Sequence, residues 1–301
     1  MKYLSVCSGI EAATVAWHGL GWTPIAFSEI EKFSSAVLAH HYPDVPNVGD
    51  MTKFRGWNLD GSVDLLVGGT PCQSFSVAGL RQGLDDPRGN LMLTFLAIAE
   101  RHRPRWIVWE NVPGVLSSNG GQDFGTFLGA LGELGYGWAF RVLDAQWFGV
   151  AQRRRRLFVV GCLGDQAGAA AVLFESESVQ RNPAPSREAR QGVARSVGGG
   201  PADGSISGAV TRKWAKGSGG PAGDECYNMV AQPVATAMQV RRLTPVECER
   251  LQGFTDNYTN IPWRKKDEAP DGPRYKALGN SMAVPCMAWI GQRIAEVDRG
   301  D

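Results

Sequence analysis

The stretch VDLLVGGTPCQ, residues 63–73, decides the fold class of this 301-residue chain. Its first half is an apolar β-type run, which breaks at Gly68-Gly69 and then presents Cys72. In an open α/β sheet, ligands bind at the carboxyl ends of the strands. The stretch therefore predicts a thiol beside a ligand site. Taken alone, a cysteine is more often a small buried apolar residue than a nucleophile.

Strand-like and helix-like stretches alternate through the first half of the chain. The pattern predicts strands near residues 4–7, 24–28, 63–67, 106–109 and 157–161, and helices near 11–18, 33–41, 91–101 and 124–134. Alternation with short connections is typical of a parallel sheet covered by helices on both faces. The sequence thus predicts an α/β domain.

The composition changes near Gly164, and residues up to about 240 are rich in Gly, Ala, Ser and Pro. Patterning returns at Leu243, where Thr244, Pro245 and Glu247 predict the start of a helix with a capping box. A final helix is expected from Ala283 to about Glu296. We expect one domain from residues 1–164 plus 270–301 and a small, irregular domain from residues 165–269. The alternative is a partly disordered insertion.

Composition limits the possible partners. The net charge is +1, so contact with a polyanion would need local patches such as residues 153–156, 241–242 and 264–266. Such charge runs are more often solvated faces. Six cysteines occur without a C-x-x-C pair, which argues against a zinc site and a disulfide framework. No leader and no bilayer-spanning stretch is evident. We expect a reduced, cytoplasmic protein with no metal and no membrane.

Two strand ends predict a cofactor site. The first strand leads into Ser8-Gly9-Ile10, a tight turn before a helix whose backbone N–H groups can bind a polar ligand. The second strand ends at Glu29-Ile30, where a carboxylate can accept hydrogen bonds from ribose hydroxyls. Together they favour a cofactor that contains adenosine. The absence of G-x-G-x-x-G argues against a dinucleotide.

Further polar residues adjoin two later strands. Glu110 follows the apolar residues 106–109, so it should lie beside Cys72 at the same sheet edge. Burial there would raise its pKa and let it donate a proton, although a surface carboxylate is an equal alternative. In the run 152–156, a period of two places Arg154 and Arg156 on one side and Arg153 and Arg155 on the other.

The ordered motifs resemble the DNA (cytosine-5)-methyltransferase family of bacterial or phage type. The residues that carry this resemblance are Ser8-Gly9, Glu29, Gly49-Asp50, residues 69–76, Asp86-Pro87-Arg88-Gly89, Glu110-Asn111-Val112, residues 152–156, residues 242–254 and residues 275–281. They span nearly the whole chain apart from its Gly-rich middle. The full series in this order is far more specific than any single motif.

The resemblance implies a fold, a cofactor and residue roles. The fold is a Rossmann-like, mixed, mostly parallel sheet with a small target recognition domain, and the cofactor is S-adenosylmethionine. Cys72 would attack C6 of a cytosine flipped out of double-stranded DNA, Glu110 would protonate N3, and Arg156 would bind the O2 side. Cofactor contacts are expected from Ser8, Gly9, Ile10, Glu29, Ile30, Asp50, Met51, Pro71, Asn280 and Ser281. DNA contacts are expected from Gln73, Ser74, Arg154, Arg212, Lys213 and Arg242.

Several residues depart from the family pattern. Cys7 replaces an aromatic residue, Glu11-Ala12 replaces a Gly-rich turn, Ser5 stands where an acid is common, and Thr70 stands where Pro or Phe is frequent. Alternatives to a DNA methylase are a tRNA cytosine-5 methylase, a catalytically silent DNA-binding relative and an NAD-dependent oxidoreductase. We expect a monomer. A cognate restriction endonuclease cannot be inferred from this sequence.

Overall fold

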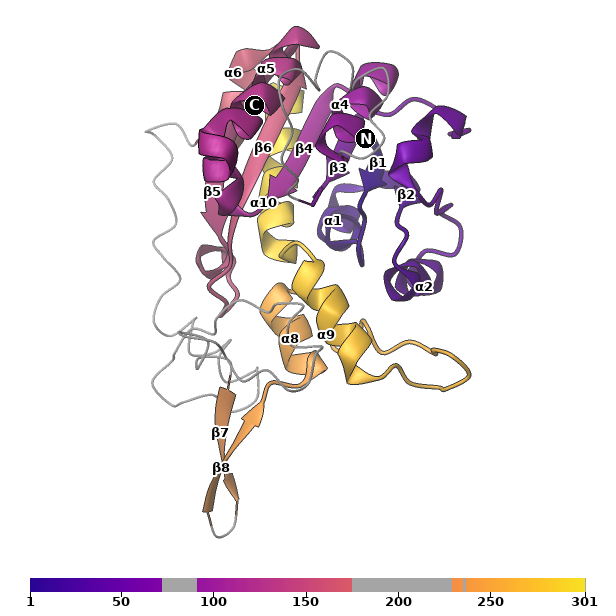
Figure 1. Cartoon of the computed structure of the whole chain (residues 1–301), viewed down its shortest axis with the longest axis vertical. Helices are drawn as coiled ribbons and strands as arrows, with labels where there is room; N and C mark the ends of the chain where they lie inside the picture. Colours follow the sequence, from indigo (N-terminus) through magenta and orange to yellow (C-terminus); the bar gives the residue numbers. More distant parts are fainter. Residues whose placement is uncertain (72–90, 175–228, 235–236, 301) are drawn as a thin grey trace.

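The computed structural model describes residues 1–71, 91–174, 229–234 and 237–300. One sheet has six strands in the order β2-β1-β3-β4-β6-β5, and a separate pair joins β7 to β8 (Figure 1). The strands are β1 (Lys2–Val6), β2 (Thr23–Ser28), β3 (Leu65–Gly68), β4 (Trp106–Asn111), β5 (Tyr136–Asp144), β6 (Arg155–Leu163), β7 (Met229–Val234) and β8 (Ala237–Arg242).

The large sheet is mixed and mostly parallel, as predicted. Strands β2, β1, β3 and β4 run parallel, whereas β6 is antiparallel to β4 and β5 is antiparallel to β6. The reversal has a functional consequence, because an antiparallel strand brings its amino end to the edge where its parallel neighbours end. The start of β6 therefore lies at the carboxyl edge of β1, β3 and β4.

The described helices surround this sheet. The α-helices are α1 (Ala12–Trp17), α2 (Lys32–His41), α4 (Leu91–His102), α5 (Gln122–Glu133), α6 (Gln166–Leu173), α8 (Pro245–Gln252), α9 (Asp271–Asn280) and α10 (Val284–Arg299). Short 3₁₀ helices are η1 (His18–Leu20), η2 (Met51–Gly56), η3 (Pro113–Gly121) and η4 (Ala145–Phe148). The predicted capping box is present at α8, where Thr244 and Glu247 each accept a hydrogen bond from the other's backbone N–H.

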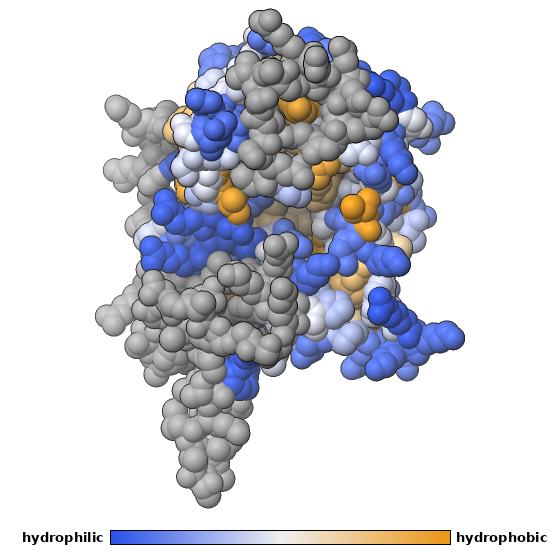
Figure 2. Space-filling view, in the orientation of Figure 1, coloured by the Kyte–Doolittle hydropathy of each residue, from blue (hydrophilic) through white to orange (hydrophobic). Residues whose placement is uncertain are grey.

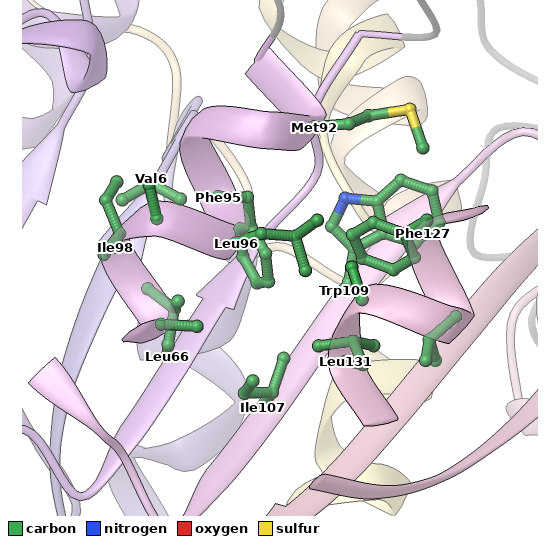
Figure 3. Close-up of a cluster of buried hydrophobic side chains, with 14 of the residues drawn as sticks. Val6, Leu66, Met92, Phe95, Leu96, Ile98, Ile107, Trp109, Phe127 and Leu131 are labelled. Atoms are coloured by element: carbon green, nitrogen blue, oxygen red, sulfur yellow. The ribbon is translucent and has the colours of Figure 1, made fainter. Parts of the chain in front are cut away.

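Alternating strand residues build two hydrophobic cores. Leu66, Ile107 and Trp109 pack with side chains of α4 and α5 on one face, as Figure 3 shows. Leu65 and Trp106 belong to the core on the opposite face, with side chains of α1, α6 and α10. This alternation follows from the period of two along a strand. Helices therefore cover both faces of the sheet.

Residues near both ends of the expected small domain pack with the sheet domain. Helix α6 was expected to lie outside the sheet domain, but its Ala169 and Val172 are buried in the core that contains Met287 of α10. At the other edge, Leu251 and Phe254 pack with residues of α1 and α2. Burial of these apolar side chains ties both segments to the sheet domain. A separate domain within residues 175–228 stays a prediction, because those residues lie outside the described ones.

Candidate active site

Glu110 and Arg156 meet at the carboxyl edge of the sheet. Glu110 lies near the end of β4 and pairs with Phe158 of β6, so Arg156, two residues away, projects from the same face. Arg156 Nε is 3.0 Å from Glu110 Oε1. The two predicted catalytic residues are therefore brought into contact by the antiparallel pairing of β4 with β6.

The environment of Glu110 suits a carboxyl group that holds a proton. Its side chain is 13% exposed, and burial raises its pKa, while the positive charges of Arg156 and Arg154 act in the opposite direction. The net effect is a raised pKa. A carboxyl group with a raised pKa can donate a proton or a hydrogen bond nearer to neutral pH.

The chain that leads to Cys72 is fixed to β4. The Thr70 hydroxyl accepts a hydrogen bond from Trp109 Nε1 at 3.0 Å, and Asn111 Nδ2 donates to the Thr70 carbonyl at 2.9 Å. At Gly69, a Cβ atom would lie 2.9 Å from Glu110 Oε2, so only glycine leaves room for this carboxylate. Pro71 is exposed. Cys72, Gln73 and Ser74 lie outside the described residues.

The turn after β1 approaches the end of β2. Gly9 has a φ of +58°, and its N–H donates to Glu29 Oε2 at 2.8 Å. A Cβ atom at Gly9 would have nothing within 4 Å, so the turn borders open space. The Ser8 hydroxyl joins the two strand ends, because it donates to the Ser5 carbonyl and accepts from the Ser28 N–H.

The other residues expected at the cofactor divide into exposed and buried ones. Ile30 is 73% exposed, whereas Ile10 is fully buried and Met51 is 4% exposed. The Asp50 carboxylate accepts hydrogen bonds from the backbone and hydroxyl of Thr52. The Ile10 side chain thus belongs to the core, and only its backbone can reach a ligand.

One cavity joins the predicted catalytic and cofactor residues. Gly9, Glu110, Asn280 and Ser281 all line it. Figure 2 shows a hollow near the middle of the displayed face, between the sheet and helices α8 and α9. Sequence reasoning assigned no role to Glu11, which also lines the cavity. The sequence did contain a signal for such a role, because Glu11 places a charged residue in a turn that is commonly rich in glycine in this family.

Arg154 has a position different from the expected one. It was predicted to contact DNA, but it is 2% exposed and donates hydrogen bonds to the carbonyls of Gly279 and Ser281 at 3.1 and 2.6 Å. Burial lowers its pKa, with a further contribution from the positive charge of Arg156. A buried guanidinium with these partners does not suit a phosphate contact. It instead fixes the segment that lines the cavity.

The remaining basic residues are only partly described. Arg153 and Arg155 are exposed, as expected from the alternation along the strand. Arg242 is exposed at the end of β8, and the neighbouring Arg241 makes two hydrogen bonds of 2.8 Å to the carboxylate of Glu247. Arg212 and Lys213 lie outside the described residues.

Comparison with known proteins identifies the family. A family model described as C-5 cytosine-specific DNA methylase matches residues 1–197 and 202–296. The chain belongs to this family. Its enzymes are S-adenosylmethionine-dependent methyltransferases, which agrees with the predicted cofactor. In the described parts of the chain, no group of three His, Cys, Asp or Glu residues could hold a metal ion, and no helix could span a bilayer.

The similar proteins carry different names. A protein of Escherichia phage P1 named DNA N-6-adenine-methyltransferase is 35% identical, over 98% of this chain and 61% of its own length. The type II methyltransferase M2.BsuMI of Bacillus subtilis is 30% identical, over 98% of this chain and 76% of its own length. The crystal structure of S. pombe Dnmt2 methyltransferase aligns with a TM-score of 0.72 over 99% of both chains at 18% identity, which supports the fold alone.

The described residues fit S-adenosylmethionine. Open space at Gly9 leaves room for the ligand beside the turn, and the Glu29 carboxylate lies where ribose hydroxyls could donate to it. The exposed side chain of Ile30 offers an apolar surface for an adenine ring. Asn280 and Ser281 line the same cavity. Burial raises the pKa of Glu29, and three backbone N–H groups stabilise its charged form.

Proposed function

We propose that this chain is a DNA cytosine-5 methyltransferase that methylates a specific sequence of double-stranded DNA. The observation that carries the proposal is the contact between Glu110 and Arg156, 3.0 Å apart, beside the anchored segment Thr70-Pro71 that immediately precedes Cys72. A proton-holding carboxyl group and a guanidinium at one sheet edge, together with a cysteine next along the chain from Pro71, match the needs of covalent addition to a cytosine ring. Methylation of an exocyclic amine would not need this addition.

Each residue has a defined step in the proposed mechanism. The Cys72 thiolate forms a bond to C6, and the electron pair displaced from the C5–C6 bond makes C5 nucleophilic. Glu110 donates a proton to N3 during this addition, and Arg156 offsets the charge that develops on the O2 side. S-adenosylmethionine, when bound, supplies an electrophilic methyl group. After methylation, a water takes the proton from C5, the C5–C6 double bond reforms as the Cys72–C6 bond breaks, and N3 returns its proton to Glu110.

The substrate must present its cytosine outside the helix. A base inside a duplex is stacked, so flipping costs a few kcal/mol before the ring can reach Cys72. We assign DNA contacts to Gln73 and Ser74 near the target and to Arg212, Lys213 and Arg242 in the region that would recognise the sequence. Arg154 is withdrawn from this group because of its burial.

Replacement of the nucleophile tests the mechanism. Cys72→Ala should abolish methyl transfer to duplex DNA while the affinity for S-adenosylmethionine persists in calorimetry. DNA with 5-fluorocytosine at the target should form a denaturation-resistant adduct with the wild-type protein when the cofactor is present. Residual turnover by Cys72→Ala, or no adduct with an active enzyme, would refute covalent addition.

Product analysis tests the alternatives. The purified chain is incubated with duplex DNA or tRNA, and the digested nucleosides are measured by mass spectrometry. We expect 5-methylcytosine in DNA. Methylated cytosine only in tRNA would favour an RNA methylase, and N6-methyladenine would agree with the name of the phage P1 relative. DNA binding without any methylated product would favour a silent relative. Bisulfite sequencing of DNA from expressing cells would identify the target sequence.

A further inference from the structure

Glu11 is a buried carboxylate at the cavity. It is 1% exposed and lines the cavity together with Gly9, Asn280 and Ser281. Among the described residues it forms no salt bridge with Lys, Arg or His. A buried carboxylate is costly unless a positive charge or several hydrogen bonds compensate it. For Glu11, hydrogen bonds rather than a cation compensate the charge.

Uncharged donors hold this carboxylate in place. Oε1 accepts a hydrogen bond from the Ser5 hydroxyl. Oε2 accepts from the Thr14 N–H at 3.2 Å and from the Thr14 hydroxyl at 2.6 Å. The Thr14 hydroxyl in turn accepts from the Tyr3 hydroxyl at 2.8 Å. The network fixes the position of the carboxylate and leaves its negative charge without a cation.

The backbone at Glu11 is also strained. Its φ of +63° and ψ of +57° lie in the left-handed region, which costs a residue other than glycine about 1 kcal/mol or more. Glycine would adopt this conformation without strain, but it would not supply a carboxylate. The strain and the buried charge at one residue both indicate that the side chain is needed there.

We propose that Glu11 binds the α-ammonium group at the amino-acid end of S-adenosylmethionine. This inference rests on the part of the proposed function that places the cofactor in this cavity. The ammonium would supply the positive charge that the carboxylate lacks among the described residues. Glu110, the other glutamate that lines the cavity, is already paired with Arg156. Ser5, where the family commonly has an acid, donates its hydroxyl to Glu11, so the turn supplies the carboxylate that the strand lacks.

Three ligands distinguish the possible roles of Glu11. S-adenosylmethionine has both an ammonium and a sulfonium, S-adenosylhomocysteine has only the ammonium, and 5′-methylthioadenosine has neither. Calorimetry on the full chain compares the wild type with Glu11→Gln, which preserves the size of the side chain. We expect affinity for the first two ligands to fall roughly tenfold to hundredfold, as for a lost charge-assisted hydrogen bond. Affinity for 5′-methylthioadenosine should not change.

Each other pattern would overturn the assignment. Unchanged affinity for all three ligands would remove Glu11 from binding. If Glu11→Gln lowers the affinity for S-adenosylmethionine alone, the carboxylate contacts the sulfonium instead. If it lowers the affinity for all three ligands equally, the role of Glu11 is purely structural. The matched control is Glu31→Gln, because Glu31 caps α2 and pairs with Lys276 away from the cavity lining. It should leave all three affinities unchanged.

Two further measurements keep the test decisive. If Glu11→Gln does not fold, Glu11→Asp keeps the charge with a shorter reach and should weaken binding of the two ammonium ligands selectively. Adding Ser5→Asp to Glu11→Gln should restore part of the lost affinity. No binding of any ligand by the wild type would refute the cofactor assignment itself. Intact affinities without DNA methylation would refute the proposed function and leave the role of Glu11 standing.

Discussion

The two sides of the cavity treat their carboxylates differently. On the cofactor side, Glu11 in the cavity lining and Glu29, which follows β2 outside that lining, are held by hydroxyl and backbone N–H donors. In the described parts of the chain, neither carboxylate forms an ion pair. On the other side, Glu110 contacts Arg156, and Arg154 also acts on its pKa. One side thus keeps negative charge for a cationic ligand, and the other balances charge around a group that can carry a proton.

The largest expected effect is on the rate of methyl transfer, and it comes from the side of Glu110 and Arg156, where the charges are balanced. Glu110→Gln removes the proton donor but preserves shape, so methyl transfer should fall about 10²- to 10⁴-fold. The affinity for S-adenosylmethionine should stay near the wild-type value, because the side with Glu11 and Glu29 is unchanged. Single-turnover methylation and calorimetry measure the two quantities. The exposed Glu133→Gln on α5 is the control. A parallel loss of cofactor affinity would show that the two sides are not separate.

Arg154 should connect the two sides. Arg154→Met leaves the carbonyls of Gly279 and Ser281 without their charged donor, which should lower the free energy of unfolding by about 3 kcal/mol. Because Ser281 lines the cavity, cofactor affinity should fall as well. Urea denaturation and calorimetry test both expectations, with the exposed neighbour Arg153→Met as the control. Equal stability of the two variants would contradict a structural role for Arg154.

Local patterns were sufficient for part of this site. The apolar run 106–109 correctly predicted the strand near whose end Glu110 lies, and the alternation over residues 153–156 correctly separated Arg153 and Arg155 from Arg154 and Arg156. Neither pattern predicted the antiparallel pairing of β4 with β6 that brings Arg156 to Glu110. The capping box at Thr244 was also correct. These predictions succeeded because strand ends and caps depend on a few neighbouring residues.

Long-range packing was the part that local patterns could not predict. The alternation of side chains placed Arg154 on the same side of the chain as Arg156. The burial of Arg154, however, depends on the carbonyls of Gly279 in α9 and of Ser281, which lie more than a hundred positions later. Helix α6 is rich in alanine and glycine, so its composition resembled a loop until packing on α10 was known. Strand β5 was missed because, at the sheet edge, its burial does not follow a period of two.

The smallest expected effect is the pH dependence that Glu11 gives to the free energy of unfolding. Burial raises the pKa of Glu11 from its ordinary value of 4.5 to about 6, despite hydrogen bonds from Ser5 and Thr14. The folded state therefore binds this proton more tightly than the unfolded state. The resulting stability is fully present below pH 4.5 and is lost as the pH rises through about 6, a change of about 2 kcal/mol.

Comparison with Glu11→Gln isolates this contribution, because other titrating groups act in both proteins. The neighbouring Tyr3, Tyr42 and Tyr258 have raised pKa values and stay protonated over this range, whereas Glu29 and Glu110 titrate in both proteins. Urea denaturation from pH 4.5 to 7.5 should show the wild type losing stability relative to the variant. Saturating S-adenosylmethionine should reduce this slope, because an ammonium beside Glu11 would stabilise the ionised carboxylate. Parallel pH profiles without the cofactor would show that Glu11 carries no uncompensated charge.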